Sequence, residues 1–209
     1  MEQKRKENAL QYCTIAAGQV FHNGKKIYDN TSVDPSSFLS DVYHSLGISY
    51  PKFYKMDNLA KTGYLAAEIL LRGTDVDTTD LKREIGVAVI NGSSSIDADT
   101  KFNKSIADFA SPSIFVYTLP NVVVGEICIR FKITGEGVVF IAPSFDTKFM
   151  YEYLRNGFDN QTFSKCLFGW IDYNEKPEAF LSIIDNIDFK AIDERYFDTF
   201  VNENILHFK

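Results

Sequence analysis

A serine in a short polar turn is the residue of this sequence best placed to do chemistry. Ser144 follows the apolar stretch Gly137 to Ala142 and precedes a segment with helical spacing, which would put it at a strand-to-helix turn. A serine hydroxyl can attack an acyl group when a neighbouring base removes its proton. One hypothesis is therefore an enzyme, an acyltransferase or thioesterase that uses Ser144.

The base that this hypothesis needs would have to be one of three histidines. They are His22, His44 and His207, and none lies near Ser144 in the sequence. One of them would have to come within hydrogen-bonding reach of Ser144 in the fold. In the alternative interpretation, Ser144 or Asp146 only caps the helix that follows.

The composition argues against several other kinds of site. A net charge of −6 disfavours a general nucleic-acid binder, which needs clustered Lys and Arg. The three cysteines, Cys13, Cys128 and Cys166, are an odd number in apolar surroundings, which predicts buried thiols. We expect no cofactor and no metal.

The sequence also gives no sign of a targeting or membrane segment. The first ten residues carry charges without an apolar core behind them, and no apolar run approaches the length of a membrane span. We expect a cytoplasmic protein with no membrane span.

The elements that would position Ser144 alternate between strands and helices. Short apolar runs predict strands at Leu10 to Phe21, Ile85 to Asn91, Gly135 to Ile141 and Phe163 to Tyr173, the second and third of them buried. Helical spacing predicts helices at Tyr54 to Leu71 with Asp57 as its cap, Ala98 to Phe109 with Asp97 as its cap, Asn121 to Phe131, after Ser144 to about Arg155, and in the tail that carries Phe189, Ile192, Tyr196, Phe197 and Phe200. This order predicts one α/β domain over residues 1–209, with a mixed, mostly buried sheet and helices on its faces.

Three segments of the chain resemble the N-terminal half of β-ketoacyl synthases, the condensing enzymes of fatty-acid and polyketide synthesis. They are KMDNLAKTGYLAAE (Lys55 to Glu68), IGVAVINGSSSIDADTKF (Ile85 to Phe102) and SPSIFVYTLPNVVVGEICIRFKITGEG (Ser111 to Gly137). The third has the family's pattern of Ser-Pro, an aromatic residue, Asn, Gly, an apolar helix and a Gly-containing turn. Within the family, the chain is similar to a truncated subgroup related to chain-length factors. The resemblance implies half of a thiolase-like fold.

The resemblance places Ser144 where the family has its nucleophilic cysteine. Condensing enzymes need a thiolate at a helix N-terminus, which serine does not supply. They also resemble one another in using two histidines from a C-terminal half, and this chain is expected to end before that half. The resemblance therefore implies a non-catalytic subunit, a partner of an active ketosynthase.

The resemblance also implies which residues meet that partner. In the family the stretch just before Asn121 approaches the partner's acyl tunnel. Four residues there, Ile114, Phe115, Tyr117 and Leu119, are large enough to set the depth of the tunnel. The same four could equally be ordinary core and strand residues.

The expected association follows from the strand Gly137 to Ala142. The family forms dimers by continuing a sheet across this strand, and its uncharged edge is a liability unless another chain covers it. We expect a heterodimer with a full-length ketosynthase or a homodimer, with acyl carrier protein as an indirect partner. A purely structural homodimer remains a third hypothesis. Lys148, Glu152 and Arg155 predict that the helix after Ser144 is exposed on one side.

Overall fold

Seven strands form one mixed sheet in the computed structural model, which describes residues 10–32, 34–77 and 80–205. The sheet order is β3-β2-β1-β7-β6-β4-β5. The strands are β1 (Gln11–Ala16), β2 (Gln19–His22), β3 (Lys25–Asp29), β4 (Ile85–Asn91), β5 (Gly137–Ile141), β6 (Lys165–Asn174) and β7 (Lys176–Asp185). Strand β4 pairs in parallel with both β5 and β6, whereas the remaining pairs are antiparallel.

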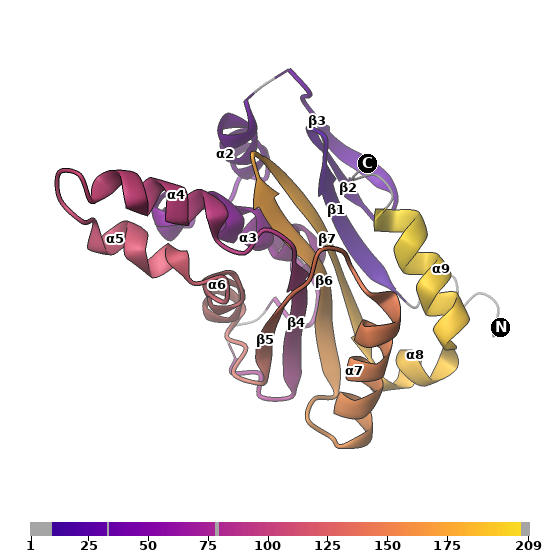
Figure 1. Cartoon of the computed structure of the whole chain (residues 1–209). Helices are drawn as coiled ribbons and strands as arrows, with labels where there is room; N and C mark the ends of the chain where they lie inside the picture. The colour runs from indigo at the N-terminus through magenta and orange to yellow at the C-terminus, as the bar shows by residue number, and fades with distance from the viewer. Residues whose placement is uncertain (1–9, 33, 78–79, 206–209) are drawn as a thin grey trace.

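Helices cover both faces of this sheet (Figure 1). They are α2 (Pro35–Ser45), α3 (Asn58–Leu71), α4 (Ile96–Ser105), α5 (Pro112–Phe115), α6 (Val122–Phe131), α7 (Thr147–Asp159), α8 (Asn186–Ala191) and α9 (Glu194–Ile205), with short 3₁₀ turns η1 (Pro51–Lys55) and η2 (Val116–Thr118). One core cluster joins the sheet to α2, α3 and α6, and the other joins it to α7, α8 and α9. The predicted α/β class, with a mixed sheet between helical layers, is confirmed.

The apolar composition of β4 and β6 explains why these two parallel strands lie at the centre of the sheet. Every residue of β4 is buried, and in β6 only the first and last residues are not. Such strands read as continuous apolar runs because helices cover both of their faces. The predicted pairing of Val87 to Ile90 with Val138 to Ile141 is confirmed, with Ala88 opposite Val138.

Helix α3 is the most buried helix and organises one face of the sheet. Asp57 caps it as predicted, since its side chain accepts a hydrogen bond from the backbone of Ala60 at 2.9 Å. Gly63 lets α3 approach α6 closely, because a Cβ there would lie 2.3 Å from a methyl carbon of Val123. The predicted start at Tyr54 was wrong: Tyr54 belongs to η1, and α3 begins after a break.

Helices α4 and α5 form an arm that projects beyond the edge of the sheet (Figure 1). We call α4, α5, η2 and the loop that joins α4 to α5 the arm. Neither α5 nor η2 contains a buried residue, and α4 contains only Ala98. The arm is therefore anchored to the rest of the fold by few contacts.

The predicted strand at Leu10 to Phe21 is in fact a hairpin. Ala17 and Gly18 turn the chain between β1 and β2 with φ values of 50° and 75°. Asn23 and Gly24 make the next turn in the same conformation, with φ values of 50° and 74°. Positive φ at both central residues is typical of the tightest hairpin turns, and Asn-Gly is their strongest sequence signal.

Two further expectations were wrong. Helix α4 begins at Ile96, two residues earlier than expected, so Asp97 is not its cap but lies in the first turn, bonded to Lys101 at 2.7 Å. Strand β7 was not predicted; it forms a hairpin with β6 around Glu175 and pairs with β1 at its other edge. Strand β5 is not buried as expected: it is an edge strand with partly exposed side chains.

Within the described ranges, no single helix is long and apolar enough to cross a membrane. The segments Pro112–Thr118 and Val122–Phe131 meet the length and composition criteria only when taken together across a bend of 98°.

Candidate functional site

Ser144 lies at the predicted strand-to-helix turn, between β5 and α7. It is exposed. The cap of α7 is Asp146, whose side chain accepts a hydrogen bond from the backbone of Phe149 at 2.9 Å. The helix after Ser144 is exposed on the side that carries Lys148 and Arg155, as expected. The turn is thus explained by helix capping without any chemistry.

The described histidines have partners other than Ser144. A ring nitrogen of His22 lies 3.4 Å from the side-chain nitrogen of Asn23, and His44 Nε2 is 3.0 Å from the hydroxyl of Tyr54. Burial lowers the pKa of His22. His207 lies outside the described residues. In the part of the chain that the structure describes, the hydrogen bonds of His22 and His44 go to Asn23 and Tyr54 and not to Ser144.

The segment predicted to meet a partner folds as α5 and η2 and leads into α6. Asn121 stands exposed at the N-terminus of α6. Phe115 and Leu119 are each 55% exposed. Ile114 and Tyr117 are half-buried and turn inward, where they line a cavity. Phe115, Leu119 and Asn121 thus lie on the molecular surface, whereas Ile114 and Tyr117 line a cavity, and Tyr117 also packs against the core cluster of α2, α3 and α6.

This cavity has a volume of about 680 Å³ and lies between the arm and the beginning of α3. It is mostly apolar, and its lining comes from three separate segments: Lys55, Met56 and Asp57; Ala98 and Lys101; and Ser113, Ile114, Val116 and Tyr117. Volumes of roughly 300 to 1,000 Å³ are typical of small-molecule sites. We call it the arm cavity. Its lining from α3 and α4 was not predicted, because no local pattern reveals that these segments meet.

Charged groups lie at one side of the arm cavity. Burial raises the pKa of Asp57 to about 6, helped by the negative charge of Asp97 and opposed by the backbone donor of Ala60. Burial and the nearby charge of Lys101 lower the pKa of Lys61, whose ammonium lies over an aromatic ring. The cavity thus has polar lining at Asp57 and Lys101 and an apolar wall formed by α5 and η2.

A buried carboxylate holds Tyr117 in that wall. Glu126 on α6 is only 4% exposed and accepts a hydrogen bond from the Tyr117 hydroxyl at 3.2 Å. The other carboxylate oxygen of Glu126 is 2.6 Å from the ammonium of Lys52 on η1. Burial, followed by the charge of Glu126, raises the pKa of Tyr117, so this hydroxyl stays protonated and donates. One carboxylate therefore links η1, η2 and α6.

Large apolar side chains are exposed on the arm, on α6 and on β5. Phe109 at the tip of the arm is 75% exposed and Ile141 at the end of β5 is 54% exposed. The other members of this surface are Ile106, Phe115, Val116, Leu119 and Ile129. We call it the arm–β5 surface. Val116 belongs both to this surface and to the cavity lining, so the cavity opens toward it.

Strand β5 adds an unpaired backbone edge to this surface. The carbonyl of Glu136 accepts from Val87 at 2.8 Å, and the N–H of Ala142 donates to Asn91 at 3.0 Å. Alternate residues of a parallel strand point toward its neighbour. The N–H and C=O groups of Gly137, Val139 and Ile141 therefore point away from β4, where another strand could bind them.

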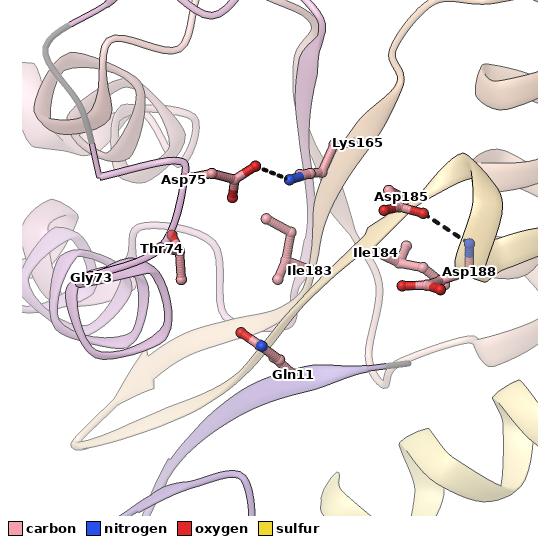
Figure 2. A pocket seen from close by; sticks show the side chains of 9 residues that line it. All are labelled: Gln11, Gly73, Thr74, Asp75, Lys165, Ile183, Ile184, Asp185 and Asp188. Carbon is pink, nitrogen blue, oxygen red and sulfur yellow. Dashed lines mark hydrogen bonds and ion pairs between the residues drawn. The ribbon is translucent and has the colours of Figure 1, made fainter. Parts of the chain in front are cut away.

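A second, polar cleft of about 400 Å³ lies at the amino end of β6 (Figure 2). The ammonium of Lys165 is paired with Asp75 at 2.7 Å, and Asp185 accepts a hydrogen bond from the backbone of Asp188 at 2.8 Å, as Figure 2 shows. These groups bind one another. Over the described residues, no group of three or more side chains is arranged to hold a metal ion.

No family model matches the sequence, and no curated protein matches it. Solved structures do match. One is the ishigamide ketosynthase/chain length factor, with a TM-score of 0.64 and 14% identity over 85% of this chain and 61% of that chain. A second is the ketosynthase ApeO in complex with its chain length factor ApeC from Xenorhabdus doucetiae, with a TM-score of 0.55 and 13% identity over 84% of this chain and 76% of that chain. A third is AntDE:AntF, a type II PKS acyl-carrier protein in complex with its ketosynthase bound to the hexaketide, with a TM-score of 0.52 and 15% identity over 85% of this chain and 63% of that chain.

The chain has part of the thiolase-like ketosynthase fold. It spans 61% of the first of these chains and 63% of the third. The expected half of a thiolase-like fold is confirmed at the level of the fold. The role of Ser144 and of the residues before Asn121 is tested neither by the comparisons nor by the geometry.

Proposed function

We propose that this chain is a non-catalytic, chain-length-factor-type subunit that binds a full-length ketosynthase of polyketide synthesis. The observation that carries the proposal is the arm cavity together with the exposed apolar side chains of the arm, α6 and the edge strand β5. Two of the similar structures are complexes or pairs of a ketosynthase and a chain length factor.

The chemistry at Ser144 supports a non-catalytic role. A serine hydroxyl ionises far less readily than a cysteine thiol and needs a base to attack a thioester. The described histidines bind Asn23 and Tyr54 instead. Condensation would then take place in the ketosynthase alone, and this chain would shape the space into which the product grows.

The charge pattern of the two sheet edges supports the proposed interface. Strand β3, at the far edge, has the sequence KKIYD, whose lysines disfavour pairing with another strand. Strand β5 has the sequence GVVFI, which has no such protection. An antiparallel or parallel strand added at β5 would also cover Ile141 and bring its own chain next to the arm.

In this assembly, the acyl chain would enter the arm cavity from the partner. The apolar wall of Ile114, Val116 and Tyr117 suits a hydrocarbon chain, since each methylene that leaves water gains about 0.8 kcal/mol. Phe115 and Leu119 would contact the ketosynthase directly. Acyl carrier protein would then bind the complex through the ketosynthase.

Co-expression with a full-length ketosynthase from the same genome tests the proposal. We expect a one-to-one complex on size exclusion, and products that shorten or lengthen when Ile114 is replaced by Phe or Ala. A chain that stays monomeric with every such ketosynthase, or forms only a homodimer, would overturn it. Hydrolysis of an acyl thioester by the chain alone, lost in Ser144→Ala, would instead support the serine acyltransferase or thioesterase.

A further inference from the structure

The Tyr117 ring depends on polar contacts for its position. Neither α5 nor η2 contains a fully buried residue, and Tyr117 is only partly buried where it packs against the core cluster of α2, α3 and α6. Two hydrogen bonds add to this contact. The hydroxyl of Ser95 donates to the carbonyl of Thr118 at 2.7 Å, which fixes the backbone, and Tyr117 donates to Glu126, which fixes the ring.

Glu126 is a rigid anchor for that ring. It lies on α6, which packs closely on α3 at Gly63 and is tied to α3 by an ion pair between Arg130 and Glu68 at 2.8 Å. The carboxylate is buried and bound on its other side by Lys52. A carboxylate that Lys52 already holds loses less rotamer freedom when it also fixes the tyrosine hydroxyl.

We propose that Glu126 is a positioning residue that sets the length of unbranched acyl chain the arm cavity accepts, by holding the Tyr117 ring in the cavity wall. The inference rests on the proposed function and adds to it a specific determinant and a ligand class. Tyr117 meets the ligand, and Glu126 acts only through Tyr117. Lys52 binds the other carboxylate oxygen of Glu126 and so keeps the side chain turned toward the tyrosine hydroxyl.

The first measurement is the affinity of the protein for fatty acids of different chain lengths. Saturated fatty acids of increasing length are used to displace a fluorescent polyene fatty acid from the purified chain and from its complex with the ketosynthase. We expect the Kd to fall about fourfold per added methylene until the chain meets Tyr117, and to stop falling there. We call the chain length at which the Kd stops falling the break. Tyr117→Ala should move the break to longer chains.

Two milder variants separate positioning from simple loss of the ring. Tyr117→Phe keeps the ring but removes the donor, and Glu126→Gln keeps a side chain of the same shape but removes the charge that binds Lys52. Both should shift the break in the same direction as Tyr117→Ala, by fewer carbons. The double variant should shift it no further than the larger single change, because the two residues act as a pair.

Glu68→Gln is the matched control. Glu68 is another buried carboxylate in an ion pair with α6, but it does not contact Tyr117. It should lower stability to a similar degree and leave the break unchanged. If Glu126→Gln and Tyr117→Phe keep the wild-type break, the positioning role is wrong, although the proposed function stands. If no fatty acid binds the chain or its complex, the ligand class is wrong, and complex formation on size exclusion still decides the proposed function.

Discussion

A proline at Val139 tests whether the sheet continues across β5. The N–H of Val139 points away from β4, so proline there removes no hydrogen bond within the chain. Proline is tolerated on edge strands when the missing N–H faces outward. We therefore expect Val139→Pro to fold with nearly wild-type stability and to lose affinity for the ketosynthase.

The size of the loss follows from the hydrogen bond that disappears. A partner carbonyl that faces residue 139 would be buried without a donor, which costs about 1 to 3 kcal/mol. This corresponds to a roughly 5- to 150-fold weaker Kd, since about 1.4 kcal/mol is a factor of ten. The proline ring also keeps the two strands apart, which adds to the loss.

Isothermal titration of the ketosynthase with each variant measures this difference. Val139→Ala is the control, because it shortens the side chain but keeps the N–H, and thermal unfolding checks that both variants are folded. If Val139→Pro and Val139→Ala bind equally well, strand pairing at β5 is wrong. The apolar side chains of the arm would then have to carry the interface alone.

Three further outcomes are expected. Gly63→Ala should lower the free energy of unfolding by about 1 to 3 kcal/mol, because its Cβ would lie 2.3 Å from a methyl carbon of Val123. Gly125→Ala, whose Cβ would have nothing within 4 Å, should raise it by about 0.8 to 1 kcal/mol in the same urea titration. Equal effects of the two substitutions would refute the close packing of α3 on α6. Burial raises the pKa of Asp57 to about 6, so its contribution to stability is present at about pH 4 and is lost as the pH rises through 6. Asp57→Asn should keep the cap, remove this loss of up to roughly 2 to 3 kcal/mol, and flatten the pH dependence of urea unfolding. An unchanged pH profile would contradict the assignment of the raised pKa to Asp57. Ser144→Ala and the wild-type chain should both release no carbon dioxide above background from acyl and malonyl carrier-protein thioesters, and turnover that the substitution abolishes would overturn the non-catalytic reading.

The strands and helices that follow local patterns were predictable from the sequence. A run such as IGVAVIN specifies a buried strand, and Asp57 specifies the start of α3, because the causes lie within a few residues. Strand β7 was not predictable in this way. It follows β6 in a hairpin, but its other neighbour is β1, and that pairing, with Gln11 opposite Ile183, joins residues more than a hundred positions apart.

The same limit applies to the candidate site. Strands β4 and β5 have similar compositions, and only the order of the whole sheet makes one central and the other an edge. Ile114 and Tyr117 were predicted from the family resemblance, and their role at a partner's acyl tunnel stays a prediction. Lys101 could not be linked to them, since it reaches the arm cavity only through the folding of α4 against α5.

The covering of the sheet explains why association is expected at one place. Helices α8 and α9 close the face on which α7 lies: Phe197 packs on Phe168 with ring centroids 5.3 Å apart, and Thr147 hydrogen-bonds Asp198. The core on that side is complete within the chain. Most of the large apolar side chains that stay exposed in the described residues lie instead on the arm, α6 and β5. Because exposed apolar side chains and an open strand edge are both costly in water, a partner gains the most free energy by binding there.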